Sequence, residues 1–150
     1  MSLMTRLTED MKLAMKAREA GKFRLSVIRM ARASLKNVEI NERRELTDDD
    51  VVTILSKEVK MRRDSAGEFE KAGRMDLVES LQEEVAILME YLPQQLSAEE
   101  VETLVKQAVE QSKAASVREM GKVMAIIMPQ VKGRADGKLV NELVRKALGA

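Results

Sequence analysis

The sequence predicts an all-α protein with about seven helices in two subdomains. Every long segment places its apolar residues at the 3.6-residue spacing of a helix, and no segment alternates apolar and polar residues as a strand would. Residues that start and stop helices recur between these segments. The apolar content of 45% is normal for a folded chain, and the 34% of charged residues leave a net charge of only +1. We therefore expect an ordered chain.

A first helix is expected before Gly21, and a second is expected to run from about Lys22 to Arg43. Gly21 is expected to separate them, because glycine accepts the left-handed conformation that closes a helix. Their inward residues are expected to be Leu3, Leu7, Met11, Ala14 and Met15 in the first helix, and Leu25, Ile28, Ala31, Leu35 and Val38 in the second.

The third helix should start at Thr47, because a hydroxyl cap followed by three aspartates suits the positive end of a helix dipole. It should end near Gly73, and Pro93 should stop the fourth. The expected inward residues are Val52, Leu55, Val59, Ala66 and Phe69 in the third helix, and Leu77, Val78, Leu81, Val85, Leu88 and Met89 in the fourth.

The segment around Pro93 is the expected boundary between a four-helix subdomain, residues 1–93, and a three-helix subdomain, residues 94–150. Ser97 with Glu100 predicts a capping box for the fifth helix, and Ser116 with Glu119 predicts another for the sixth. The inward residues expected in the last three helices are Val101, Leu104, Val105, Ala108 and Val109; Met120, Val123, Met124, Ile127 and Met128; and Leu139, Val140, Leu143, Val144 and Leu148.

The stretch "KGRADGK", residues 132–138, looks like a phosphate-binding loop but lacks the P-loop pattern. Its two glycines are one residue too close, Leu139 replaces the hydroxyl residue, and a helix precedes it where a strand is required. It predicts a helix–turn–helix, in which Pro129 ends or kinks the sixth helix and Asp136 caps the seventh. Turn geometry is assigned to Gly121, Pro129, Gly133, Asp136 and Gly137.

Positive charge is concentrated in two parts of the chain. Residues 113–150 hold eight basic and three acidic residues, a net +5, and residues 16–36 hold seven basic and one acidic, a net +6. Such surfaces attract phosphate backbones, although a solvated polar face is the alternative. The candidate RNA-binding residues are Arg118, Lys122, Lys132, Arg134, Lys138 and Arg145, with a secondary basic face on the second helix formed by Lys22, Arg29, Arg32 and Lys36.

Several kinds of chemistry lack their residues. With no cysteine and no histidine there is no thiol nucleophile, imidazole base or common zinc site, so an enzyme would have to work with carboxylates, lysines and hydroxyls alone. We expect no catalytic residues, metal or cofactor. Two Phe and one Tyr supply few platforms for base stacking, so RNA would be recognised through backbone and shape. No membrane span or signal-peptide pattern is present, which favours the cytoplasm.

Four stretches carry a resemblance to a known family. "RLSVIRMARASLKNVEI", "SKEVKMRRDSAGEFEKAGR", "EYLPQQLS" and above all "MGKVMAIIMPQVKGRADGKLVNELV" resemble the GatB/YqeY family, over nearly the whole chain. The same helical module forms the tail of the B subunit of the glutamine-dependent aminoacyl-tRNA amidotransferase. The positions that match the tail motif are Met120, Gly121, Lys122, Met124, Met128, Pro129, Gly133, Arg134, Ala135, Asp136, Gly137 and Val140.

The resemblance implies a tRNA-contacting role in which Lys122 and Arg134 reach tRNA, assisted by Lys132 and Lys138. It also brings the family label of a carbon–nitrogen ligase with glutamine as amido-N-donor. The chain has no room for the ATP-using domain and no amidase-like Ser-Ser-Lys constellation, so we expect a non-catalytic accessory protein. Expected partners are tRNA or another structured RNA, and an amidotransferase or aminoacyl-tRNA synthetase component.

Two further hypotheses stay open. One is an amidotransferase-type enzyme, and the other is a protein–protein adaptor that uses apolar, methionine-rich grooves. Arg62 falls on the apolar stripe of the third helix, where an unpaired charge would be costly. It is expected to extend its charged end to solvent, to pair with an acid of a neighbouring helix or, with Arg63, to form the lip of a groove between helices.

Overall fold

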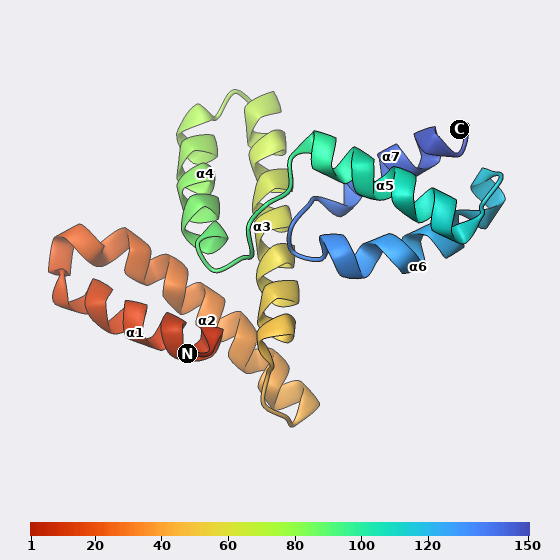
Figure 1. Ribbon diagram of the computed structural model, residues 1–150. Helices are drawn as coiled ribbons and strands as arrows, with labels where there is room; N and C mark the ends of the chain where they lie inside the picture. The colour runs from red at the N-terminus through yellow and green to blue at the C-terminus, as the bar shows by residue number, and fades with distance from the viewer. The chain divides into compact units, whose positions relative to one another are not determined.

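A computed structural model describes residues 1–150 and contains seven α-helices, two short 3₁₀ turns and no strand (Figure 1). The predicted all-α fold class is confirmed. The chain forms two compact units, Met1–Leu92 and Pro93–Ala150, and each has its own hydrophobic core. No helix combines the length and the apolar character that crossing a membrane would require.

The first unit holds four helices: α1 (Leu3–Lys16), α2 (Lys22–Glu42), α3 (Asp48–Lys71) and α4 (Met75–Met89). Helices α3 and α4 form a hairpin, and α1 and α2 pack against each other and against this hairpin. The buried core consists of Leu7, Val27, Ile28, Ala31, Leu35, Val51, Leu55, Val59, Ile87, Leu88 and Tyr91.

Gly21 separates α1 from α2 for a different reason from the one predicted. Its φ is −99°, so it is not left-handed; the left-handed residue of this turn is Arg18, with a φ of 53°. A Cβ on Gly21 would lie 2.2 Å from the Ala14 carbonyl oxygen, well inside van der Waals contact. Glycine is therefore required here because the turn packs directly on the backbone of α1.

The start of α3 is capped as predicted. The Thr47 hydroxyl accepts a hydrogen bond from the Asp50 amide, and the Asp50 carboxylate accepts one from the Thr47 amide at 2.8 Å. Arg44 adds an ion pair to Asp50 with an N–O distance of 2.7 Å. The hydrogen bonds from Arg44, and then those from Thr47, hold the pKa of the Asp50 carboxyl well below its usual range.

Tyr91 ties the end of α4 to α1. Its ring is buried, its hydroxyl donates a hydrogen bond to the Asp10 carboxylate, and the Arg6 guanidinium carbon lies 4.6 Å from the ring centroid. Burial, and then the hydrogen bond to Asp10, raise the pKa of Tyr91. The ring therefore joins residues that lie far apart in the sequence.

The apolar stripes were predicted well at their centres and less well at their edges. Val51 and Ile87 are buried although the stripes omitted them, whereas Val52 is only half-buried. Met15 and Met128 were expected inward but are 50% and 40% exposed. Both lie near the end of a helix, where the packing of neighbouring helices no longer covers the whole stripe.

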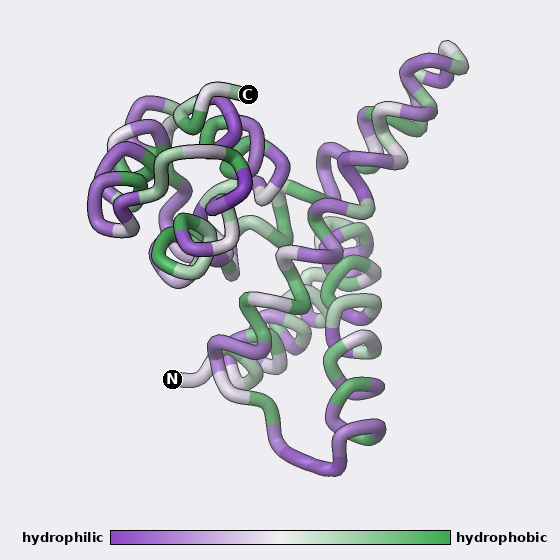
Figure 2. The backbone as a smooth tube through the Cα atoms, turned by 90° about the vertical axis from the view of Figure 1, so that its right-hand side faces the viewer, coloured by the Kyte–Doolittle hydropathy of each residue, from purple (hydrophilic) through white to green (hydrophobic).

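The second unit holds α5 (Ala98–Ser112), α6 (Met120–Val131) and α7 (Gly137–Ala147), which pack pairwise. Along each helix hydrophobic residues recur between hydrophilic ones, as Figure 2 shows for the whole chain. The buried core of this unit consists of Val101, Val105, Ala108, Val123, Ile127, Val131, Val140 and Val144.

The capping box of α5 is confirmed, with Ser97 and Glu100 each bonding to the other's backbone amide. The box predicted for Ser116 and Glu119 is wrong. Ser116 makes no capping bond, because a 3₁₀ turn, Val117–Glu119, comes between it and the start of α6.

Pro129 does not end α6 at Met128, as one of the predictions had it. The helix continues to Val131, and the Lys132 amide still bonds to the Met128 carbonyl at 3.0 Å. Proline removes the donor that would reach the carbonyl of Ala125. Ala125 is exposed, so water can satisfy its carbonyl.

Candidate nucleic-acid interface

The turn between α6 and α7, residues 132–136, is the part of the candidate surface whose backbone is best defined. Gly133 is left-handed, with a φ of 71°, which reverses the chain after α6. The Asp136 carboxylate then accepts a hydrogen bond from the Lys138 amide at 3.1 Å and caps α7. The turn is therefore defined at both ends by its own sequence.

A segment that precedes α5 holds the same turn from outside. The Leu96 amide donates to the Arg134 carbonyl at 2.8 Å, and the Gln95 side-chain amide donates to the Gly133 carbonyl at 2.7 Å. The Arg134 Nε in turn donates to the Gln94 carbonyl at 3.1 Å. Three hydrogen bonds thus fix the turn to a segment almost 40 residues away in sequence, and they make it a rigid platform.

Arg134 therefore has a structural role that its sequence position did not reveal. It is half-buried, and its Nε is taken by the hydrogen bond to Gln94. Its planar guanidinium carries further N–H donors that remain for an external acceptor. Sequence reasoning missed Gln94 and Gln95, since two amides after a proline carry no recognisable signal for a contact of this range.

Lys132 and Lys138 are the exposed cations of this turn. Neither takes part in an ion pair or a side-chain hydrogen bond within the chain. They flank the turn, at the end of α6 and the start of α7. A free ammonium group on a fixed turn is well suited to meet a phosphate.

Arg118 and Lys122 lie at the other end of α6. The helix has 12 residues, so Lys122 and Lys132 are about 15 Å apart along its axis. Lys122 is 67% exposed but pairs with Glu119, with an N–O distance of 3.3 Å. The cations predicted as one patch are therefore two groups, one at each end of the helix.

Arg145 shares a face of α7 with Lys138, two turns further along. Glu142 lies on the same face, four residues after Lys138 and three before Arg145. An acid between two cations reduces the positive potential of this face. Arg145 therefore contributes less to the surface than its charge alone suggests.

The glycines assigned to turns beside these cations are in fact helical. Gly121 and Gly137 lie in the first turns of α6 and α7, and neither has a positive φ. A Cβ on either would meet no atom of the chain within 4 Å. The fold itself therefore does not require glycine at these two positions.

The secondary basic face on α2 is confined to the first unit. Lys22, Arg29 and Lys36 are exposed on the outer side of the helix. Arg32 is half-buried: one terminal nitrogen donates to the Met11 sulfur at 3.1 Å, and its Nε has no partner. Three of the four predicted residues thus form an open cationic stripe, and the fourth packs against α1.

No group of three or more acidic side chains is placed to hold a metal ion. The chain has no cysteine or histidine to add to such a group.

These features define a class, an all-α protein of two helical units whose second unit presents exposed cations on a rigid turn. More particularly, the chain belongs to the YqeY-like protein family, whose model matches residues 4–148. The resemblance seen in the sequence is confirmed.

Two curated proteins are similar to the chain. One is the "Altered inheritance of mitochondria protein 41, mitochondrial" of Pyrenophora tritici-repentis, which is 31% identical over 151 residues that cover 99% of this chain and 82% of that protein. The other is the E subunit of the glutamyl-tRNA(Gln) amidotransferase of Thermococcus gammatolerans, which is 44% identical over 57 residues. That match covers 35% of this chain and 9% of the archaeal protein.

Proposed function

We propose that this chain is an RNA-binding accessory protein that takes structured RNA, tRNA foremost, on the turn between α6 and α7. Lys132 and Lys138 contact phosphate groups, and the free N–H groups of Arg134 assist them. The chain contributes binding rather than bond-making chemistry in this proposal.

The observation that carries the proposal is that two lysines without an ion pair lie on a turn whose backbone is held in place by hydrogen bonds. Lys132 and Lys138 form no ion pair within the chain, and the turn is held by three hydrogen bonds to residues 94–96. Lysines on a rigid element lose less entropy on binding than lysines on a mobile loop. Phosphate contacts of this kind supply affinity that does not depend on sequence.

Similarity to the archaeal amidotransferase subunit supports a role with RNA, but it does not assign that protein's activity to this chain. The archaeal relative is named for an amidotransferase that acts on glutamyl-tRNA(Gln), and a stretch of 57 residues is alike. Because that stretch is 9% of the archaeal protein, transamidation is not part of the proposal. The compartment is not part of it either, since the fungal relative is named as mitochondrial.

Lys22, Arg29 and Lys36 on α2 are proposed as a second, weaker contact. Their side chains line one face at helical spacing and are exposed. Arg29→Glu with Lys36→Glu is expected to weaken binding of tRNA less than changes at the α6–α7 turn, because the outer face of α2 carries no comparably fixed turn.

Charge reversal tests the proposal, with bulk tRNA as the probe and fluorescence anisotropy as the readout. The Lys132→Glu, Lys138→Glu double variant should bind at least about tenfold more weakly, because two phosphate contacts are lost and two repulsions are added. Arg134 is left unchanged, since its hydrogen bond to Gln94 supports the turn.

A matched control carries the same change of charge elsewhere. Lys57→Glu with Lys106→Glu alters two exposed lysines that form no ion pair, one on the outer face of α3 and one on the outer face of α5. This control should bind tRNA almost as well as the unchanged protein. Equal losses in the two double variants would show a diffuse charge effect and would refute the assignment to the turn.

A further inference from the structure

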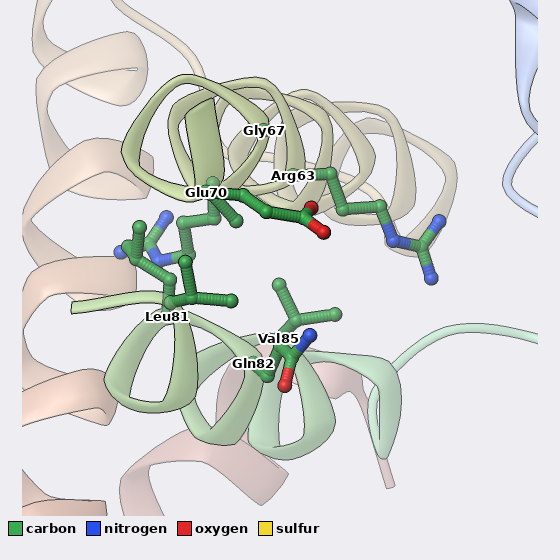
Figure 3. A pocket seen from close by; sticks show the side chains of 9 residues that line it. Arg63, Gly67, Glu70, Leu81, Gln82 and Val85 are labelled. Carbon is green, nitrogen blue, oxygen red and sulfur yellow. The ribbon is translucent and has the colours of Figure 1, made fainter. Parts of the chain in front are cut away.

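The hairpin of α3 and α4 carries a groove that the RNA surface does not use. It has a volume of about 390 Å³ and lies between the C-terminal half of α3 and the middle of α4. Figure 3 shows it from close by: Gly67 and Glu70 lie on the α3 side, and Leu81, Gln82 and Val85 lie opposite them on α4. All its residues belong to the first unit.

Within the first unit, the groove exists because no third helix packs on this part of the hairpin. The buried core joins α1 and α2 to Val51, Leu55 and Val59 of α3 and to Ile87 and Leu88 of α4. Toward the α3–α4 turn only Val78 is fully buried, and Leu81 is half-buried. Two helices alone cannot cover both flanks of their contact, so an apolar floor stays open to solvent.

Gly67 widens the groove where the fold gives no reason for a glycine. It lies inside α3, its φ is not positive, and a Cβ there would meet no atom within 4 Å. Glycine inside a helix is less stable than alanine. A bare backbone facing a groove allows another backbone to approach closely, as small residues do where helices cross.

The length of the groove suits a helix. On α3 it runs from Arg62 to Glu70, and on α4 from Val78 to Val85, a separation of eight and seven residues. Seven residues span about 10 Å, or two helical turns. An amphipathic helix places side chains at i, i+3 or i+4, and i+7 on one face, so three of them would fit this length.

The surroundings of the groove are acidic. The groove-bearing stretch, residues 62–85, holds seven acids and four basic residues, a net −3, and the basic residues include Arg62 and Arg63 of the groove lining. Arg62, at one end, is already neutralised: it pairs with Glu58 at 2.7 Å and with Glu84 at 3.5 Å, and its side chain is 11% exposed. The pair that Arg62 was expected to form with a neighbouring helix is present in Glu84 of α4, and Arg62 and Arg63 also line the groove, as the other expectation had it. With both arginines counted, the acids of this stretch still outnumber its basic residues.

We propose that this groove binds an amphipathic helix of another protein, with its apolar side chains on Leu81 and Val85 and flanking Lys or Arg side chains near Glu70. Charge complementarity selects a basic helix, and Gly67 provides the point of closest approach. The proposal does not depend on RNA binding by the second unit.

The probe is a synthetic peptide of about 18 residues, five helical turns. It has Leu on one face and Lys on the other, and its twin carries Glu in place of Lys. Binding to the whole chain is measured by anisotropy, and the contact is mapped by amide chemical shifts. The basic peptide should bind and shift the amides of residues 62–85, while the acidic twin should not.

Gly67→Leu should fill the groove and weaken the binding of the basic peptide by at least about tenfold in Kd. The variant should fold, since nothing in the chain occupies that space. Ser65→Leu adds the same bulk on the opposite side of α3 and should leave binding unchanged. Thermal unfolding of both variants checks that the fold is intact.

Four results would overturn the proposal: no binding of the basic peptide, equal binding of the acidic twin, equal binding to the Gly67→Leu variant, or shifts outside the groove. Sedimentation that shows a dimer abolished by Gly67→Leu would assign the groove to a second copy of the chain instead. Loss of tRNA binding in Gly67→Leu would assign it to RNA. Failure here leaves the Lys132 and Lys138 experiment untouched, so the two proposals are tested separately.

Discussion

Gly21 and Gly67 differ in the space around them, and this decides whether the fold requires a glycine at each position. Gly21 has a carbonyl oxygen 2.2 Å from where a Cβ would be, and Gly67 has open space. Neither has the left-handed backbone that sequence reasoning assigns to glycine by default. Gly133 does have it, with a φ of 71°. The role of a glycine thus depends on what lies beside it.

Alanine substitutions at Gly21 and Gly67 should change stability in opposite directions. Gly21→Ala should lower the free energy of unfolding by about 1–3 kcal/mol, because the added methyl group forces α1 and the turn apart. Gly67→Ala should raise it by about 0.5–1 kcal/mol, because the unfolded chain loses freedom and nothing clashes. Urea denaturation followed by circular dichroism measures both. A change of the same sign in the two variants would contradict the packing described around Gly21.

At the scale of elements, the second unit contains two serines that look alike in sequence. Ser97 and Ser116 are each followed three residues later by glutamate. Only Ser97 caps a helix, because α5 begins directly after it, whereas a 3₁₀ turn follows Ser116. The pattern predicts a capping box in both places, and the local backbone decides which one forms.

Replacing each serine by alanine separates the two cases. Ser97→Ala should destabilise the protein by about 1 kcal/mol, the usual cost of losing a helix cap. Ser116→Ala should have almost no effect, since its hydroxyl caps nothing. Thermal melts of the two variants, compared with the unchanged protein, provide the measurement. A loss in Ser116→Ala as large as in Ser97→Ala would show that α6 is capped by that residue after all.

The cap of α3 makes stability depend on acidic pH. Arg44 and Thr47 lower the pKa of Asp50, so the folded protein holds a proton at this carboxyl less readily than the unfolded chain does. The stabilisation is present above the unfolded pKa of about 4 and is lost as pH falls toward the lower folded pKa.

Asp50→Asn should therefore flatten part of the acid response. Urea midpoints measured at about pH 6 and about pH 3 should differ less in Asp50→Asn than in the unchanged protein, because the variant has no carboxyl to protonate there. A control variant, Asp64→Asn, removes an exposed carboxyl that forms no ion pair. If Asp50→Asn and Asp64→Asn respond to acid in the same way, the Arg44–Asp50 contact does not stabilise α3.

Helix type could be predicted along the whole chain because the 3.6-residue period is a local signal that packing reinforces. The starts of α3, α5 and α7 were also predicted correctly from their capping residues Thr47, Ser97 and Asp136. Pro129 did not mark a helix end, because the carbonyl that it leaves unpaired belongs to exposed Ala125. The sequence shows the proline, but it does not show the solvent exposure of Ala125 that allows the helix to continue past it.

At the scale of the whole molecule, two units each bury their own core and carry different surfaces. The second unit has a rigid cationic turn, and the first has a groove with acidic surroundings in its α3–α4 hairpin. The charge clusters could be counted from the sequence, and Arg62 with Arg63 pointed to a groove. Which cations are free could not be predicted, because it depends on Glu119 beside Lys122 and on Gln94 beside Arg134.

The central claim, that the α6–α7 turn binds RNA phosphates, is tested most directly by the salt dependence of tRNA affinity. Binding constants are measured from about 50 to 200 mM salt for the unchanged chain, for the Lys132→Glu, Lys138→Glu variant, and for the Lys57→Glu, Lys106→Glu control. The slope of log K against log salt should be about 2 smaller in magnitude in the first variant, about one for each lost phosphate contact, and unchanged in the control. A slope that is the same in all three proteins would contradict the account.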